Sequence, residues 1–247
     1  MKSLLTVLFC LCVLVGCGKK PLTVDSTVEI ADPIVEKAIR WVLQKPTGEL
    51  TKADLEKVTG LFLAKSQLTE IPTDLKKLTQ LDSLSLWDNK LTSLEGLEKL
   101  TQLKDLDLED IQLADVQGLE KLTKLEGLIL GGNQLTDVQG LKELTQLKML
   151  QLGKNQLTDV KGLEKLTQLE RLLLYNNQLR DLKGLETLAQ LKDLDVHGNQ
   201  LTSVKGLENL TQLKELNLLD NPELTKAQID QLQKALPKCE IKHNAKK

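Results

Sequence analysis

The sequence has few aromatic residues. Only 2% of its 247 residues are aromatic (two Trp, one Tyr and two Phe), although 40% are hydrophobic. Globular cores normally use aromatic rings to fill irregular space. This chain must therefore build its core from aliphatic side chains, chiefly leucine, which indicates similar units stacked in register rather than an irregular core.

The sequence also lacks an excess of charge of either sign. The chain carries 33 Lys and Arg against 35 Asp and Glu, for a formal net charge of −2. A nearly neutral chain of mixed signs has no extended positive field to attract a polyanion. We therefore exclude nucleic acid as a partner.

Catalytic and metal-binding motifs are absent from the sequence. It contains no H-E-x-x-H, no G-x-S-x-G, no phosphate loop and no paired-cysteine metal site. His243 lies in a basic tail, whereas His197 alternates with Asp193 and Asp195 along a predicted strand. Those three side chains, with Glu215 on the next unit, could hold a cation or form a solvated polar face. We predict no catalytic residues, no cofactor and no resident metal.

Cysteine is scarce, and its placement argues against a disulfide framework. Cys10 and Cys12 lie in an N-terminal apolar run, which leaves Cys17 and Cys239. We expect no disulfide, because Cys17 has a different use. Cys239 is interpreted as a small buried hydrophobe.

The N-terminus is typical of a secretory signal. Lys2 precedes an apolar run from Leu4 to Val15, which is too short to cross a ~30 Å hydrocarbon layer as a helix. The run ends in Leu14-Val15-Gly16-Cys17, which resembles the lipobox of bacterial lipoproteins. That resemblance implies cleavage before Cys17, lipidation of its thiol and acylation of the new amino terminus. The alternative is an ordinary signal peptide with an incidental cysteine.

The resemblance also bears on localisation. In Gram-negative lipoproteins an aspartate after the lipidated cysteine implies retention in the inner membrane, and Gly18 stands there instead. We therefore expect a lipid-anchored protein of the bacterial cell envelope, with the outer membrane favoured if the cell is Gram-negative.

An internal repeat dominates the rest of the chain. The segment GLEKLTQLKxLxLxxNQLTDVK recurs with few changes. Aligned on the first leucine of LxxLxLxxNxL, eight units follow one another every 22 residues, with one interval of 23; they begin at Val58, Leu81, Leu103, Leu125, Leu147, Leu169, Leu191 and Leu213. Repetition this regular indicates a solenoid, because one unit cannot bury its own apolar face.

This repeat resembles the leucine-rich-repeat family over residues 58–224, and its length resembles the internalin-like bacterial class. The resemblance implies an α/β solenoid: a right-handed horseshoe with a parallel β-sheet on its concave side and short 3₁₀ or extended segments on its convex side. The alternation at Leu128 and Leu130 independently predicts a strand. Six units place an asparagine in the turn after the strand, where a buried amide can satisfy main-chain groups, namely Asn89, Asn133, Asn155, Asn177, Asn199 and Asn221. Ile111 replaces it in the third unit, as an apolar plug in a rearranged turn or as a functional kink.

Both ends of the solenoid are predicted to be capped by helices. Asp32-Pro33 begins a helix over residues 33–44 with Ile34, Ala38, Ile39 and Val42 on its apolar face, and Thr51-Lys-Ala-Asp54 begins a second helix to about Lys57. Thr225-Lys-Ala-Gln228 opens a last helix, which ends before Pro237 and precedes a short strand at residues 239–241. The predicted regions are a signal peptide (1–16), lipidated cysteine and tether (17–30), helical cap (31–57), repeats (58–224), C-terminal cap (225–243) and tail (244–247).

A candidate binding surface lies where the repeat varies. Positions three, five and seven of each unit point away from the core, and they differ from unit to unit. Across neighbouring strands they gather an apolar patch with an arginine, a hollow left by Gly131, Gly132 and Gly153, and an acidic border. The candidate partner-binding residues are Trp87, Asp105, Asp107, Glu109, Ile129, Met149, Arg171, Leu173, Tyr175 and His197. Tyr, Trp, Met and Arg are favoured at interface centres.

These observations predict a membrane-anchored monomer that binds a protein or peptide through its concave face. Two alternatives stay open. The chain could be a structural scaffold or spacer of the envelope whose convex side, rich in lysine and glutamate, matters instead. It could also be a glycan- or cation-dependent receptor.

Overall fold

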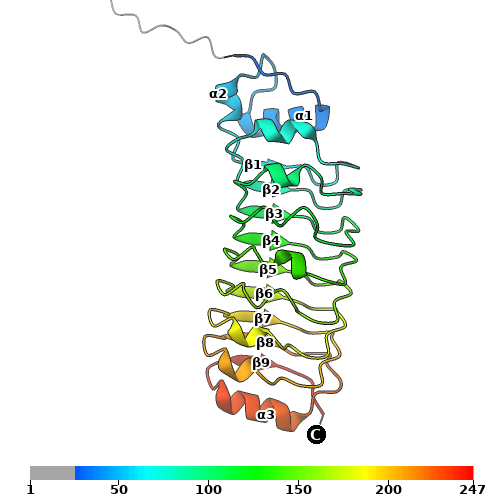
Figure 1. Cartoon of the computed structure of the whole chain (residues 1–247), viewed down its shortest axis with the longest axis vertical. Coiled ribbons are helices and arrows are strands. Elements are labelled where there is room, and N and C mark those ends of the chain that lie inside the picture. Colours follow the sequence, from blue (N-terminus) through cyan, green and yellow to red (C-terminus); the bar gives the residue numbers. More distant parts are fainter. Residues whose placement is uncertain (1–25, 247) are drawn as a thin grey trace, which may run out of the picture.

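The computed structural model describes residues 26–246, and the N-terminal residues that carry the predicted signal peptide and Cys17 lie outside this range. The described chain is an elongated solenoid with one β-sheet along its length (Figure 1). Nine parallel strands pair in chain order. They are β1 Gly60–Phe62, β2 Ser83–Ser85, β3 Asp105–Asp107, β4 Gly127–Ile129, β5 Met149–Gln151, β6 Arg171–Leu173, β7 Asp193–Asp195, β8 Glu215–Asn217 and β9 Glu240–Lys242. The predicted leucine-rich-repeat solenoid is confirmed.

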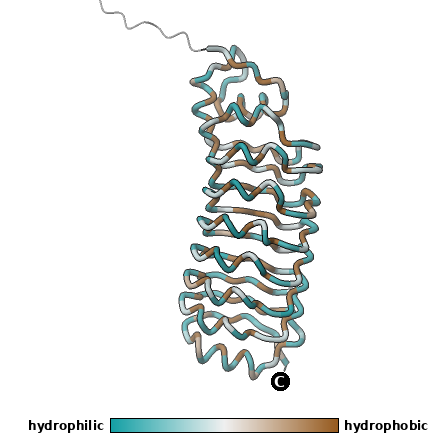
Figure 2. Tube along the Cα trace, viewed as in Figure 1, coloured by the Kyte–Doolittle hydropathy of each residue, from teal (hydrophilic) through white to brown (hydrophobic). Residues whose placement is uncertain are grey.

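The register of the sheet follows the repeat. Equivalent residues of consecutive units are paired, so that Leu128 lies beside Leu150 and Leu150 beside Leu172. These three central leucines have no exposed surface, whereas their neighbours along each strand face outward in part. Hydropathy therefore alternates from brown to teal along each coil in Figure 2. One leucine-rich core runs through the whole stack, and each unit is stabilised by the coils on either side.

The repeated asparagines satisfy main-chain groups of the turns, as predicted, and they also join consecutive coils. Asn177 is buried, and its Oδ1 accepts the N–H of Leu157 (3.0 Å) in the coil before. Its Nδ2 donates to the carbonyls of Leu152 and Leu174 (both 3.0 Å). One amide thus satisfies main-chain groups of two coils that the tight turn leaves unpaired. Ile111, which breaks the series, is buried as an apolar plug.

The convex side carries short 3₁₀ helices, which are η1 Thr73–Lys77, η2 Leu97–Lys99, η3 Gln139–Leu141, η4 Leu185–Thr187 and η5 Leu207–Asn209. Glycines precede several of these turns for a conformational reason. Gly162 stands at the equivalent position of a coil whose turn is not a 3₁₀ helix; it has φ +96, and a Cβ there would crowd the main chain of Gln139 in the preceding coil. Only glycine combines the left-handed backbone with this close approach between coils.

The N-terminal cap consists of α1 (Pro33–Leu43) and α2 (Lys52–Leu55). Asp32 accepts the N–H groups of Ile34 and Val35, which confirms the predicted N-cap. The predicted apolar face was wrong in part: Val35 and Ile39 are the buried positions, whereas Val42 is exposed. The difference arises because the helix packs on β1 through a face turned by one residue.

A second helix start uses a capping box. Thr51 accepts the N–H of Asp54, and the Asp54 carboxylate accepts the N–H of Thr51. The Asp54 carboxylate also pairs with Lys45 Nζ (2.7 Å). That helix ends at Leu55, earlier than predicted.

At the other end, α3 (Lys226–Ala235) begins at the predicted box of Thr225 and Gln228. The final strand β9 begins at Glu240, one residue later than predicted, and pairs with β8. Cys239 is a buried free thiol, and burial raises its pKa to about 11. Among residues 26–246 no helix is long and apolar enough to cross a membrane.

Candidate binding face on the concave sheet

The candidate site is the face of the sheet that points away from the core, hereafter the concave face. It is formed by the first and third residues of each strand and by the second residue after each strand. Parallel register places Ile129, Gln151, Leu173 and Asp195 side by side across β4 to β7. The sequence-predicted residues therefore share one face, as the repeat requires.

A buried glutamine connects the acidic and aromatic parts of this face. Gln151 Nε2 donates to the Tyr175 hydroxyl (3.1 Å) and to Glu109 Oε1 (3.3 Å). The residue is only 8% exposed, and its Oε1 has no hydrogen-bond partner in the described chain. Gln151 thus links coils on both sides of its own strand.

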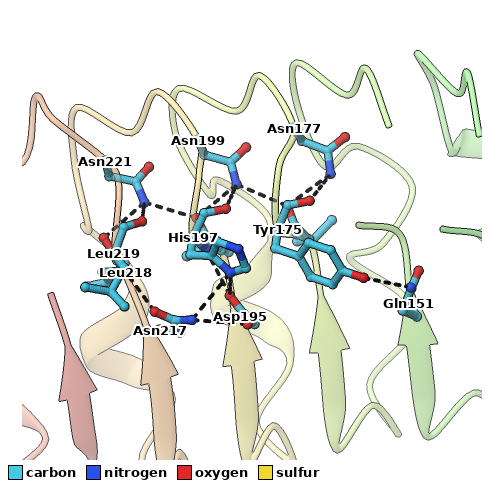
Figure 3. A network of polar contacts seen from close by, with 12 residues as sticks. Gln151, Tyr175, Asn177, Asp195, His197, Asn199, Asn217, Leu218, Leu219 and Asn221 are labelled. Carbon is cyan, nitrogen blue, oxygen red and sulfur yellow. Dashed lines mark hydrogen bonds and ion pairs between the residues drawn. The ribbon is translucent and has the colours of Figure 1, made fainter. Parts of the chain in front are cut away.

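The aromatic part of the face is ordered by stacking and by hydrogen bonds (Figure 3). The Tyr175 and His197 rings stack nearly parallel, with centroids 5.2 Å apart. His197 Nδ1 lies 2.8 Å from Asp195 Oδ1, and Asn217 Nδ2 donates to Asp195 Oδ2 (3.2 Å). One connected network therefore runs from Glu109 to Asn217.

The glycines do not leave the predicted hollow. A Cβ on Gly153 would overlap the Tyr175 ring, and one on Gly131 would overlap the Gln151 amide. A Cβ on Gly132 would meet the Asp110 carboxylate. The prediction of a shallow depression was wrong, because larger side chains of neighbouring coils fill the space that the glycines vacate.

The acidic border lies on β3 and the residues just after it. Burial, followed by the nearby charges of Asp110 and Asp107, raises the pKa of Glu109. Burial also raises the pKa of Asp105, with Glu126 and Asp82 adding to the effect. Among residues 26–246, neither these two acids nor Asp107 forms an ion pair, whereas Asp193 is paired with Arg171 (2.7 Å). The border is thus a concentration of unpaired negative charge.

Two predictions about the apolar patch need correction. Ile129, Met149 and Leu173 are half-buried instead of exposed, so the patch offers less apolar surface than expected. Arg171 is not free beside it, because Asp193 holds the guanidinium in an ion pair.

Trp87 lies farther along the face, and Lys65 Nζ lies 4.4 Å from its ring centroid. A cation at this distance over an indole is attracted by the negative face of the ring. Lys65 was not singled out by the sequence, since it belongs to the turn of the first unit.

The cation hypothesis for His197 finds no support in the geometry. Asp193 turns to Arg171, while Asp195 is engaged by His197 and Asn217. No group of three or more His, Cys, Asp or Glu in residues 26–246 is arranged to hold a metal ion.

Comparison with known proteins identifies the repeat. The family model described as "Leucine Rich repeats (2 copies)" matches residues 79–121, 123–165, 145–189, 167–207 and 189–234. The chain belongs to the leucine-rich-repeat family. None of the curated proteins matches it significantly by sequence.

Solved structures of bacterial leucine-rich-repeat proteins are similar to this one. Internalin C2 of Listeria monocytogenes is 28% identical with a TM-score of 0.66, and the match covers 76% of this chain and 93% of that one. The leucine-rich-repeat protein LIC12759 of Leptospira interrogans is 32% identical with a TM-score of 0.71. That match covers 76% of this chain and about half (49%) of the Leptospira chain.

Two members of the network were missed in this leucine-rich-repeat protein, Gln151 and Asn217. Both are polar residues at the fifth position of a unit and look like ordinary solvent-facing residues. A signal for Gln151 did exist: glycines at position seven of two neighbouring units, Gly131 and Gly153, make room for large side chains on the adjacent coils.

Proposed function

We propose that this leucine-rich-repeat protein binds another protein or a peptide through its concave face. The family membership and the similarity to internalin C2 over 93% of that chain support the proposal. The observation that carries it is the network from Glu109 through Gln151, Tyr175 and His197 to Asn217. The network orders the aromatic side chains on a surface that lies outside the leucine core.

A surface whose side chains are ordered before binding loses less conformational entropy on association. Immobilising a free side chain on association costs about 0.5–1.5 kcal/mol. The Tyr175 ring is already held by the stack with His197 and by the bond from Gln151, so this cost falls on folding. The unpaired carboxylates of Asp105, Asp107 and Glu109 beside it favour a partner segment with basic side chains.

The binding face is tested by the double substitution Tyr175→Ala and Leu173→Ser. Both side chains lie outside the core, so we expect loss of partner capture from envelope extracts by a variant that still unfolds cooperatively, with a melting temperature lowered no more than that of Gly153→Ala. The matched control is the convex pair Lys183→Ala and Lys205→Ala, which should capture as the wild type does. Unchanged capture by the concave variant would refute this assignment, and loss in the convex control would favour the scaffold alternative.

We further propose that Cys17 anchors the protein to a bacterial membrane, with the outer membrane favoured by Gly18. The lipobox-like sequence before Cys17 supports this proposal, and several acyl chains anchor a protein stably at ~0.8 kcal/mol for each buried CH₂. Cys17→Ser should release the protein into the soluble fraction, whereas Cys12→Ser, within the predicted signal, should leave it with the membranes. A Cys17→Ser protein that still fractionates with membranes would contradict the anchor.

A further inference from the structure

Consecutive coils are joined at the turn by two main-chain contacts outside the sheet. The N–H of the turn leucine donates to the asparagine Oδ1 of the next coil, as from Leu135 to Asn155 (3.0 Å). The carbonyl of that leucine accepts the N–H of the residue after the asparagine, as Leu135 does from Gln156 (2.9 Å). The same pair of bonds is made by Leu113, Leu157 and Leu179.

Leu91 makes neither of these two bonds, because Ile111 stands where the asparagine should be. The Leu91 N–H has lost its acceptor, and Gln112 does not donate to the Leu91 carbonyl. Gln112 has φ +61, a left-handed conformation that its equivalents Gln134, Gln156, Gln178 and Gln200 do not share. The turn is thereby rotated, and Leu91, only 5% exposed, keeps a donor and an acceptor without partners in the described chain.

A cleft opens at this junction. Its volume is about 880 Å³, and it is lined by residues 90–95, Glu98, 111–115, Gln117 and Gly118. This size falls within the range of about 300–1,000 Å³ typical of ligand sites. Ile111 itself lines this cleft, which therefore coincides with the break in the asparagine series.

The unpaired N–H and carbonyl of Leu91 determine which kind of ligand the cleft would bind. A main-chain donor and acceptor that line a cleft without a partner in the described chain favour a ligand that pairs both groups. A donor and an acceptor on one residue are what an added β-strand engages, whereas a single ion satisfies only one of the two. The lining holds three acids, Glu95, Glu98 and Asp115, none in an ion pair within residues 26–246, and one base, Lys90. Glu98 accepts the Gly96 N–H and lies near Lys99 and Lys121, so Glu95 and Asp115 carry most of the uncompensated charge.

We propose that this cleft is a second binding site, which takes an extended peptide segment carrying a basic side chain. The segment's main chain exchanges hydrogen bonds with Leu91, and its basic side chain lies at the acidic rim. The site lies at the turns that follow β2 and β3, off the concave face, so it does not depend on the function proposed for Tyr175.

A substitution that closes the site without damaging the fold is available. Ile111→Asn restores the residue found at this position in six other units, where Asn is accommodated in the buried turn. It should accept the Leu91 N–H and return the Gln112 N–H to the Leu91 carbonyl. Ile111→Leu, which keeps an apolar plug, is the matched control.

Amide hydrogen exchange of the chain, followed residue by residue by NMR, tests the geometry. The Leu91 amide should exchange fast in the wild type and in Ile111→Leu, and slow by about tenfold or more in Ile111→Asn. Protection of Leu91 in the free wild type would overturn the proposal.

Selection of random short peptides displayed on phage, with counter-selection on Ile111→Asn, tests the occupant. We expect basic, extended peptides that slow exchange at Leu91 and Gln112, lose about tenfold in affinity on Ile111→Asn, and bind Tyr175→Ala unchanged. If no peptide is enriched and exchange at Leu91 is unaltered, the cleft holds only water and the proposal is refuted. Peptides that bind Ile111→Asn equally but fail on Tyr175→Ala belong to the concave face and would also refute the proposal.

Discussion

Removing one asparagine from the buried series is the sharpest test of what joins the coils. In Asn177→Ala, the Leu157 N–H loses the one acceptor that it has among residues 26–246, Asn177 Oδ1. The carbonyls of Leu152 and Leu174 lose one donor each but keep a second, from Asn155 and Asn199 respectively (both 3.0 Å).

The magnitude follows from that difference. A buried N–H left unpaired costs about 1–3 kcal/mol, and each weakened carbonyl adds up to about 1 kcal/mol. We therefore expect Asn177→Ala to lower the free energy of unfolding by about 3 kcal/mol. With a urea m-value of about 2 kcal/mol/M, the midpoint should fall by about 1.5 M.

The assay is urea unfolding followed by circular dichroism, and Gln178→Ala is the control. Gln178 is the exposed neighbour, and within the described part of the chain its main-chain N–H alone is engaged, with the Leu157 carbonyl. Its truncation should cost no more than about 0.5 kcal/mol. A loss below about 1 kcal/mol for Asn177→Ala, or equal losses for the two variants, would refute the role assigned to the buried amides.

Two other predictions concern the cap and the concave face. The Lys45 ammonium and the Thr51 N–H hold the pKa of Asp54 well below its usual value, so this stabilisation is present above about pH 4 and is lost as the pH falls. Asp54→Asn should therefore melt lower than the wild type at pH 6 and show a smaller further drop at pH 3; equal drops would exclude Asp54 as the source of acid sensitivity. Gly153→Ala should displace the Tyr175 ring and cost about 1–3 kcal/mol in unfolding experiments, because its Cβ overlaps that ring. Gly60→Ala, whose Cβ would meet Ser83 only at 3.9 Å, should be tolerated, and equal losses would argue against the overlap.

Much of the candidate site was predictable because register follows from the repeat. A 22-residue period with leucine at fixed positions places the third, fifth and seventh residues of each unit on the outer face. The sequence alone therefore located Tyr175, Asp107 and His197 on that face. The details of contact were not predictable. Whether the Gly153 position is empty or filled depends on the rotamer of Tyr175 in the next coil, which the repeat does not encode.

The helix caps also separate into features that local sequence predicts and features that depend on tertiary packing. The caps at Asp32, Thr51 and Thr225 were found from sequence because N-capping is a local hydrogen bond within a few residues. The buried face of α1 was misplaced, since it depends on how the helix docks on β1. Asp74 illustrates the point: its carboxylate accepts the N–H of Asp32 (2.8 Å) from 42 residues away, a contact that no local pattern reveals.

The linear order of residues settled the architecture of this protein, because leucine and asparagine recurring at one period allow only a stack of parallel coils to bury the former and satisfy the latter. Tertiary structure decided which outer side chains are free, paired or covered. It also showed that the single exchange at Ile111 leaves the main chain of Leu91 open, since the consequence of that residue falls on the coil before it and not on its own.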